Sequence, residues 1–165
     1  MLDKNLLLVD IGGTNIRYAY SNIGDSDFVS ENKAELDSLN DFDNLMSELL
    51  AESDVKNIVF SVAGPKVNNS IKMTNRNFEI DADEIRKRFN LESCYLLNDW
   101  ESIGYSIRTF SENDFDNFKE GEPFNDNFLV IGPGTGLGAS VISGNNVIAT
   151  EIGNTNLGLS ALKSL

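Results

Sequence analysis

Residues 6–17 read LLLVDIGGTNIR, and this stretch decides the fold of the chain. An apolar run ends in Asp10, a Gly12-Gly13 turn follows, and from Asn15 onward apolar and polar residues alternate. That two-residue period is typical of a β-strand and not of a helix. A buried strand therefore delivers a carboxylate into a glycine turn, and the chain returns as a second strand. Such a turn presents backbone N–H groups beside a carboxylate that can bind a metal ion. This arrangement suits the phosphates of a nucleotide and Mg²⁺.

A second strand-turn-strand element lies near the other end of the chain. Residues 128–142 read FLVIGPGTGLGASVI, with glycines at 132, 134, 136 and 138 between two apolar runs. A single Gly-Gly turn is most simply a hairpin that requires positive φ angles. Two such elements in one chain are harder to attribute to turns alone, because they can face one another and hold a polyphosphate between two sets of backbone amides. Neither glycine loop opens a helix, which argues against a nicotinamide oxidoreductase.

The composition restricts the classes of function. The 165 residues include 26 acidic and 13 basic side chains, and the formal net charge of −13 disfavours nucleic acid and anionic membranes as partners. There is no histidine, so acid-base chemistry must fall to carboxylates. Cys94, the only cysteine, is expected to be a buried packing residue in a reduced, cytoplasmic protein. The apolar run after MLDK meets Asp10 too soon for a signal or membrane segment.

Hydrophobic periodicity predicts strands and helices in alternation. The expected strands are 5–11, 15–21, 27–35, 57–62 and 95–99, the first three antiparallel and the last two joining the sheet in parallel. The expected helices are 41–52, a helix ending near 90 that Asp81 or Asp83 caps, and 100–109. Residues 66–80 are expected to form an irregular hairpin. This order predicts an α/β protein with a sheet covered by helices on both faces.

One segment, 111–126, has the composition of a linker, since it is rich in Asn, Asp, Ser and Glu and contains a Gly and a Pro. We predict a first domain over 1–110, the linker over 111–126, and a last segment over 127–165. In that last segment Gly144-Asn145-Asn146 is a turn signal. Two strands cannot bury a core of their own, so the segment either docks on the first domain or begins something longer.

Asp99 is the strongest candidate for a general base. It stands where an apolar strand ends and a helix is expected to begin, and ligands of open α/β sheets bind in the crevice beyond such strand ends. The simplest alternative is a helix N-cap, which the sequence LLNDW taken alone favours. Asp10 is the candidate carboxylate ligand of a metal ion. A carboxylate at the end of a buried strand is costly to desolvate unless it has a partner, and a metal ion is such a partner. Cys94, Trp100 and Tyr105 are expected to be packing residues.

A series of motifs in fixed order resembles the bacterial glucokinases of the sugar kinase/actin-like ATPase superfamily. The motifs are DIGGTN at 10–15, SVAGP at 61–65, MTN at 73–75, LLND at 96–99, GPGTGLG at 132–138 and a degenerate EIGN at 151–154. The resemblance implies the ribonuclease-H-like/actin-like ATPase fold, with the small amino-terminal domain followed by the opening hairpin of the large domain. It also implies ATP-dependent phosphorylation of a hexose, with glucose as the expected substrate.

The resemblance assigns roles to individual residues. It implies that Asp99 accepts the proton of the attacking sugar hydroxyl, that Asn98 hydrogen-bonds the sugar, and that Asp10 binds Mg²⁺ through water. The other residues implied to bind the nucleotide are Gly12, Gly13, Thr14, Asn15, Gly134, Thr135, Gly136 and Gly138. The other residues implied to bind sugar are Glu151, Asn154 and Asn75. These roles are physically reasonable, because phosphoryl transfer requires positioning, charge neutralisation and a hydroxyl acceptor.

The chain departs from the family pattern in two places. Family members carry Gly and then His where this chain has Ile152 and Asn154. Asparagine can still hydrogen-bond a sugar, although GNTN is equally compatible with a surface turn. A further sugar-binding acid and the adenosine pocket of the family would lie beyond Leu165. The sequence is therefore expected to be a fragment or a truncated product of a glucokinase-like enzyme.

Other classes of function remain as alternatives. A non-catalytic sugar- or phosphate-binding module would keep the first domain and lose turnover. A repressor of the same superfamily would need a basic helix-turn-helix before the first strand, and MLDK leaves no room for one. The expected partners are a small-molecule hexose and ATP, without nucleic acid or membrane. The oligomeric state stays open, and a homodimer is compatible with the sequence.

Overall fold

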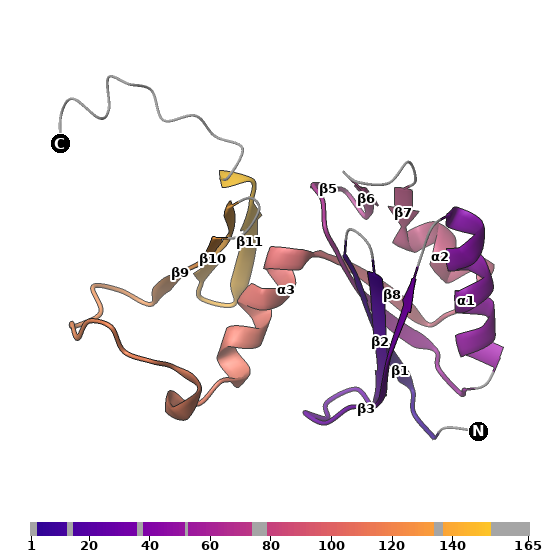
Figure 1. The fold of residues 1–165 in the computed structure, drawn as a ribbon, viewed down its shortest axis with the longest axis horizontal. Coiled ribbons are helices and arrows are strands. Elements are labelled where there is room, and N and C mark those ends of the chain that lie inside the picture. The colour runs from indigo at the N-terminus through magenta and orange to yellow at the C-terminus, as the bar shows by residue number, and fades with distance from the viewer. Residues whose placement is uncertain are drawn as a thin grey trace. The chain divides into compact units, whose positions relative to one another are not determined.

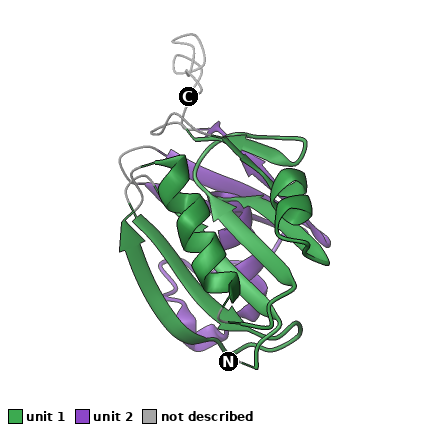
Figure 2. Cartoon of the chain, turned by 90° about the vertical axis from the view of Figure 1, so that its right-hand side faces the viewer, with its two compact units in different colours: residues 1–99 green, residues 100–165 purple. Residues whose placement is uncertain are grey.

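The computed structural model describes residues 3–12, 15–35, 38–51, 53–73, 79–133 and 137–152. The chain forms two compact units, residues 1–99 and residues 100–165, which Figure 2 shows in green and purple. The first unit contains a five-stranded and a small three-stranded sheet, and the second contains a three-stranded sheet of its own.

The large sheet of the first unit is mixed. Its strands are β1 (Leu6–Ile11), β2 (Asn15–Ser21), β3 (Val29–Glu35), β4 (Asn57–Val62) and β8 (Ser93–Asn98). Their order across the sheet is β3-β2-β1-β4-β8. β1, β2 and β3 pair antiparallel, whereas β4 pairs parallel with both β1 and β8. The predicted antiparallel start and the two parallel additions are confirmed, so the first glycine turn joins two strands.

Two helices, α1 (Leu39–Ala51) and α2 (Ala82–Arg88), pack against the same face of this sheet (Figure 1). α1 lies in the connection between β1 and β4, and α2 lies in the connection between β4 and β8. Both connections therefore lead across the sheet in the same direction, from β1 to β4 and from β4 to β8. Because crossovers between parallel strands are right-handed, two crossovers in the same direction place their helices on the same face of the sheet. The alternation of strands and helices predicts helices on both faces of the sheet. Within the first unit, α1 and α2 cover one face only, so its helices alone do not provide the predicted coverage.

The small sheet precedes α2 and consists of β5 (Lys66–Val67), β6 (Ser70–Lys72) and β7 (Glu79–Asp81). It matches the irregular hairpin expected for this region, within the described residues. Asp81 caps α2, as one of the two predicted candidates, because its Oδ1 accepts hydrogen bonds from the backbone N–H groups of Asp83 and Glu84 at 2.9 Å each.

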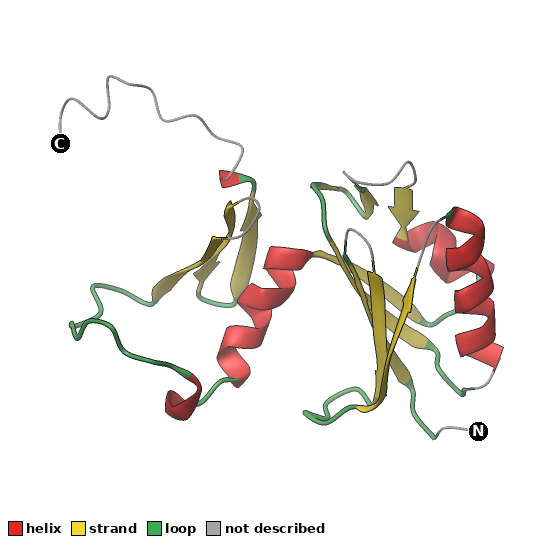
Figure 3. Cartoon of the chain, in the orientation of Figure 1, coloured by secondary structure: helices red, strands yellow, loops and turns green. Residues whose placement is uncertain are grey.

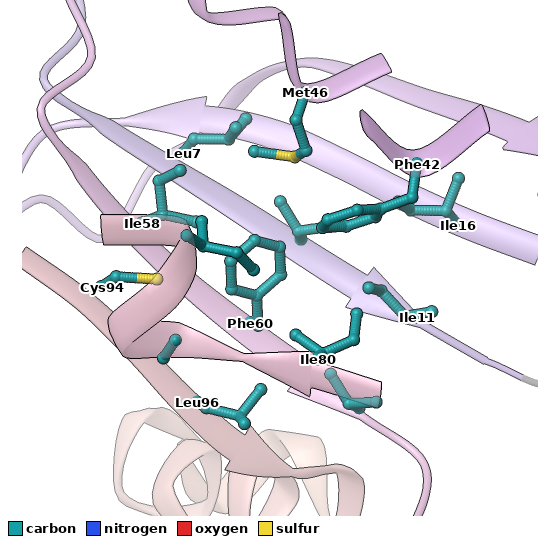
Figure 4. Close-up of a cluster of buried hydrophobic side chains, with 14 of the residues drawn as sticks. Leu7, Ile11, Ile16, Phe42, Met46, Ile58, Phe60, Ile80, Cys94 and Leu96 are labelled. Atoms are coloured by element: carbon teal, nitrogen blue, oxygen red, sulfur yellow. The ribbon is translucent and has the colours of Figure 1, made fainter. Parts of the chain in front are cut away.

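The core of the first unit lies between the large sheet and its two helices (Figure 4). Alternate strand residues point into it, and on β4 Ile58, Phe60 and Val62 have no exposed surface. The ring of Phe42 from α1 packs against that of Phe60 with 5.9 Å between centroids. Cys94 on β8 is buried, as predicted, and burial raises the pKa of its thiol to about 12. The thiol is therefore protonated at neutral pH and unsuited to nucleophilic chemistry.

The second unit consists of a helix and an antiparallel sheet. The helix α3 (Asp99–Ser106) begins at the boundary between the units and continues into a 3₁₀ turn, Ile107–Thr109. After a second 3₁₀ turn, Glu112–Asp114, come β9 (Asn127–Pro133), β10 (Leu137–Ser143) and β11 (Asn146–Thr150), in the order β11-β10-β9. Gly144 in the last hairpin turn has a φ of +54°, which fits the predicted turn.

α3 packs on one face of the three-stranded sheet. A Cβ at Gly104 would lie 2.5 Å from Val147 Cγ1 and 2.8 Å from Ser140 Oγ, so this close contact requires glycine. Successive residues of a strand point to opposite faces of a sheet. Three aliphatic side chains lie on the face that points away from α3. These are Leu129, Ile131 and Ile148, each more than half exposed.

Residues 115–126 are loop (Figure 3), and Phe118 and Phe124 within them are almost fully exposed. The packing of α3 groups residues 100–110 with the second unit, whereas the sequence analysis assigned them to the first domain. The interpretation of 111–126 as an interdomain linker stays a prediction.

Candidate active site

The candidate site is built on the carboxyl ends of the three parallel strands. Ile11, Val62 and Asn98 are paired in one row across β1, β4 and β8. The residues that follow them, among them Gly12 and Asp99, therefore leave the sheet at the same edge. Two strand spacings of about 4.8 Å separate β1 from β8, or about 10 Å. The crevice beyond such an edge is where open α/β sheets bind ligands.

Asp10 lies one residue before that row and has partners on both neighbouring strands. Ser61, paired with it on β4, donates a hydrogen bond from Oγ to Asp10 Oδ1 at 3.1 Å. Arg17, paired with it on β2, places a guanidinium nitrogen 3.6 Å from Asp10 Oδ2. The Asp10 side chain is 47 % exposed, so it is less desolvated than its place after an apolar run suggests. A ligand can therefore reach a carboxylate that Ser61 and Arg17 already orient.

The first glycine turn is partly described. The Gly12 N–H donates to the Asn15 carbonyl at 3.0 Å, which closes the turn between β1 and β2. The Gly12 amide is thus used inside the turn in this structure. Gly13 and Thr14, which sequence analysis assigned to phosphate binding, lie outside the described residues.

Asn98 and Asp99 end β8 and begin α3. Asn98 is 4 % exposed, and its side-chain amide donates to the Gly64 carbonyl at 2.8 Å. Gly64 has a φ of +145° and lies so close to β6 that a Cβ would be 2.9 Å from the Lys72 carbonyl oxygen. The turn after β4 is therefore tied to the end of β8. Asp99, the first residue of α3, is half-buried.

The second glycine element is formed by β9 and β10. Gly132 and Gly138 are paired across the two strands, and Trp100 packs against both. Gly134, Thr135 and Gly136 lie outside the described residues, as do the sugar-side candidates Asn75 and Asn154. Glu151 is exposed and follows directly after β11.

Sequence analysis missed three residues that hold the described part of the site, namely Arg17, Ser61 and Gly64. A signal for Arg17 was present, because a tight strand-turn-strand places residue 17 opposite residue 10. Ser61 lies on β4, which pairs in parallel with the side of β1 that faces away from β2. Such a pairing joins distant segments of the chain, so local sequence could not assign Ser61 as the partner of Asp10. Gly64 belongs to the SVAGP motif at 61–65, but nothing in the local sequence marks its carbonyl as the acceptor for Asn98.

The arrangement is compatible with a magnesium-dependent phosphoryl transfer. Mg²⁺ is commonly bound by one or two carboxylates together with waters and substrate phosphates. Among the described residues no three acidic, Cys or His side chains gather into a metal site, whereas Asp10 offers a single oriented carboxylate. No helix in the described part of the chain is long and apolar enough to cross a membrane.

Comparison with known proteins identifies the family. The sequence profile named Glucokinase matches residues 7–163, nearly the entire chain. The chain belongs to the glucokinase family. Among curated glucokinases, that of Colwellia psychrerythraea is 33 % identical over 150 residues, which cover 85 % of this chain and 44 % of the relative. The chain thus spans less than half the length of that glucokinase.

Solved glucokinase structures have the same fold. The glucokinase from an Antarctic psychrotroph superposes with a TM-score of 0.75 at 25 % identity, over 96 % of this chain and 53 % of that one. A ROK family glucokinase from Streptomyces griseus, solved in complex with glucose and AMPPNP, gives a TM-score of 0.64 at 20 % identity. The superposition covers 87 % of this chain and 46 % of the Streptomyces griseus protein. The actin-like ATPase fold that the motifs imply is therefore confirmed.

Proposed function

We propose that this chain is the amino-terminal half of an ATP-dependent hexose kinase that converts glucose to glucose 6-phosphate. The observation that carries the proposal is the common edge of β1, β4 and β8, where Asp10 is the last residue but one of β1 and Asp99 directly follows β8, in strands that share one register. The match to the Glucokinase family over residues 7–163 supports the substrate class. The complex of the Streptomyces griseus protein with glucose and AMPPNP supports the choice of glucose and ATP.

In this proposal the chain's own residues position the reactants and move one proton. Asp99 accepts the proton from the sugar hydroxyl as that oxygen bonds to the γ-phosphorus and the bond to the departing ADP oxygen breaks. Asn98 binds sugar hydroxyls while its amide stays anchored on the Gly64 carbonyl. The remaining sugar contacts are assigned to Glu151, Asn154 and Asn75.

Nucleotide binding is assigned to the two glycine elements. Asp10 would hold Mg²⁺, through water, with Ser61 and Arg17 fixing its carboxylate. The bound ion would neutralise charge on the β- and γ-phosphates. The proposed phosphate-binding residues are Gly12, Gly13, Thr14, Asn15, Gly134, Thr135, Gly136 and Gly138. We place the protein in the cytoplasm, where ATP and sugar phosphates are available, and a homodimer remains part of the proposal.

A second candidate function is a non-catalytic module that binds sugar or phosphate. The observation that favours it is the coverage of 44 % of the Colwellia psychrerythraea glucokinase, because the remaining surface of that enzyme has no counterpart in these 165 residues. The two candidates differ in turnover and agree in the use of the β1 carboxyl edge.

The isolated 165-residue chain is expected to bind ATP·Mg²⁺ no more tightly than about 1 mM, roughly −4 kcal/mol. The reason is that a nucleotide bound only through phosphate contacts lacks the apolar contacts that bury its base, and such contacts in water are individually modest. Hexose phosphorylation by the isolated chain should be negligible. Calorimetry with ATP·Mg²⁺ and a coupled glucose 6-phosphate assay measure both quantities, with a full-length relative as the positive control.

Micromolar affinity or steady turnover would contradict this expectation. It would mean that the chain completes its site in another way, and sedimentation of the active species would show whether a second copy takes part.

A further inference from the structure

One row of paired residues crosses the large sheet at the position of Asp10. Strand pairing places Lys33, Arg17, Asp10, Ser61 and Leu97 opposite one another on β3, β2, β1, β4 and β8. Residues paired in this way point to the same face of a sheet. On β1 and β4 the residues before and after this row are buried in the core with α1 and α2, so the row lies on the opposite face. Two cations and the candidate metal carboxylate therefore share the face that these helices leave uncovered.

The two oxygens of the Asp10 carboxylate have different partners. Ser61 donates a hydrogen bond to Oδ1 at 3.1 Å, whereas a guanidinium nitrogen of Arg17 lies 3.6 Å from Oδ2. The second distance is longer than the roughly 2.7–2.9 Å of a charge-assisted hydrogen bond. The Arg17 side chain is 60 % exposed, and ion pairs between exposed side chains contribute little to stability. Arg17 therefore holds Asp10 by charge, in a contact that costs little to open.

The positive charge of Arg17 has a second effect, because it opposes any other cation at the same carboxylate. The guanidinium lies 3.6 Å from the carboxylate, so a metal ion that Asp10 binds is repelled from well within the Debye length of about 10 Å. Salt therefore screens this repulsion only partly. A free divalent ion gains nothing that offsets the repulsion, since the carboxylate it would bind is already neutralised by Arg17.

A metal ion that carries a polyphosphate meets a different balance of charge. Arg17 can then exchange a single, loosely held carboxylate for phosphate oxygens, which match the fork of donors on a guanidinium. The same side chain thus turns from a competitor of the cation into a partner of the anion. In a chain with a net charge of −13, a cation beside the metal carboxylate also offsets the general repulsion of polyanions.

We propose that Arg17 determines which form of the metal Asp10 accepts, by disfavouring the free divalent ion and favouring the ion bound to a polyphosphate. The inference rests on the proposed function, because it takes Asp10 to hold Mg²⁺. It adds a specificity-determining residue to that function. It also makes the binding of metal and of polyphosphate at this carboxylate coupled, so that each ligand raises the affinity for the other.

The test variant is Arg17→Gln in the 165-residue chain. The matched control is Lys33→Gln, which removes the same charge from the same row but from β3, two strand spacings or about 10 Å from β1. Both side chains are exposed, so neither substitution should change the melting temperature appreciably. A second control, Ser61→Ala, removes the other partner of the Asp10 carboxylate without a change of charge.

Binding is followed through the backbone amide NMR signals of Ile11 and Val62, which are paired and lie one step beyond Asp10 and Ser61 on their strands. Each variant is titrated with magnesium chloride alone and, separately, with equimolar magnesium tripolyphosphate. Ionic strength is held constant with potassium chloride. Asp10→Asn defines the part of each signal change that depends on the carboxylate, because the chain carries 26 acidic residues that bind Mg²⁺ weakly elsewhere.

The expected effects have opposite signs for the two ligands. Arg17→Gln should strengthen binding of Mg²⁺ alone at least about threefold, because the repulsion between the two cations is removed. It should weaken binding of magnesium tripolyphosphate at least about threefold, because the phosphate loses a charged partner. Lys33→Gln should change either affinity by less than about twofold, since salt largely screens a charge at that distance. Ser61→Ala should weaken both, because it removes only an orienting hydrogen bond.

The sign of the change separates this role from a merely structural one. If Arg17→Gln weakens binding of Mg²⁺ alone, as Ser61→Ala should, or leaves either affinity unchanged, Arg17 only orients Asp10 and the proposal is overturned while the magnesium site stands. An equal effect of Lys33→Gln, or an effect of Arg17→Gln that persists in the Asp10→Asn background, would show a long-range charge effect and overturn it as well. Absence of Asp10-dependent binding in every variant would overturn both this inference and the magnesium site of the proposed function.

Discussion

Asp99→Asn is expected to lower turnover by roughly 10²–10⁴-fold in an active enzyme that contains this chain, which is the usual contribution of a positioned general base. The substitution keeps the size and the hydrogen-bonding atoms of the side chain but removes its ability to accept a proton. For the test, residues 1–165 are joined to the carboxy-terminal half of a relative such as the Colwellia psychrerythraea glucokinase, and the fusion is used once it phosphorylates glucose. Steady-state kinetics, glucose affinity and melting temperature are then measured on the same preparation.

The matched control for this substitution is Glu101→Gln, which removes one negative charge from the same first turn of α3. An acid near a helix N-terminus stabilises the helix by about 0.3–1 kcal/mol through the helix dipole, so both variants should lose a similar, small amount of stability. Only Asp99→Asn should lose turnover. Early melting combined with retained turnover in Asp99→Asn would show that the acid serves the helix and not the reaction.

Phe60→Ala is expected to destabilise the first unit by about 3–5 kcal/mol, the range found for removal of a fully buried aromatic ring. Phe60 has no exposed surface, and its ring packs against Phe42 at the centre of the core. Because small domains are stable by only about 5–15 kcal/mol, a large part of the first unit's stability would be lost. Thermal unfolding followed by circular dichroism should show a midpoint lowered by more than about 10 °C.

The control for this core variant is Tyr95→Ala on β8, where the aromatic side chain is 62 % exposed. Surface substitutions of this kind usually change stability by no more than about 0.5 kcal/mol. Reactivity of the Cys94 thiol provides a second readout, because this buried group should react only when the core opens. A Phe60→Ala chain that melts with the wild type and keeps a protected thiol would contradict the described core.

The strands of the first unit could be predicted because each carries its own signal. Alternation over residues 15–21 identified β2, and apolar runs ending in polar residues identified β1, β4 and β8. The face covered by α1 and α2 was harder to predict. It depends on the order in which the parallel strands are added, and that order is a property of the entire sheet and not of any window of sequence.

The candidate site was predictable to the extent that its residues belong to motifs. Asp10 and Asp99 stand at strand ends that hydrophobicity alone locates, and the register of β1, β4 and β8 places them at one edge. Trp100 was predicted to be a packing residue, and the structure adds what it packs on. Its contact with Gly132 and Gly138 joins segments more than thirty residues apart, so nothing in the local sequence around Trp100 could indicate it.

The open apolar face of the three-stranded sheet, formed by Leu129, Ile131 and Ile148, makes the colloidal behaviour of the chain depend on pH. At neutral pH the net charge of −13 keeps copies of the chain apart by mutual repulsion. Near the isoelectric point of about 4.2 that repulsion disappears, while the aliphatic patch is still available for association. High salt acts in the same direction by shortening the range of the repulsion. Acidification should therefore turn dispersed chains into assemblies, a transition that light scattering follows without any ligand.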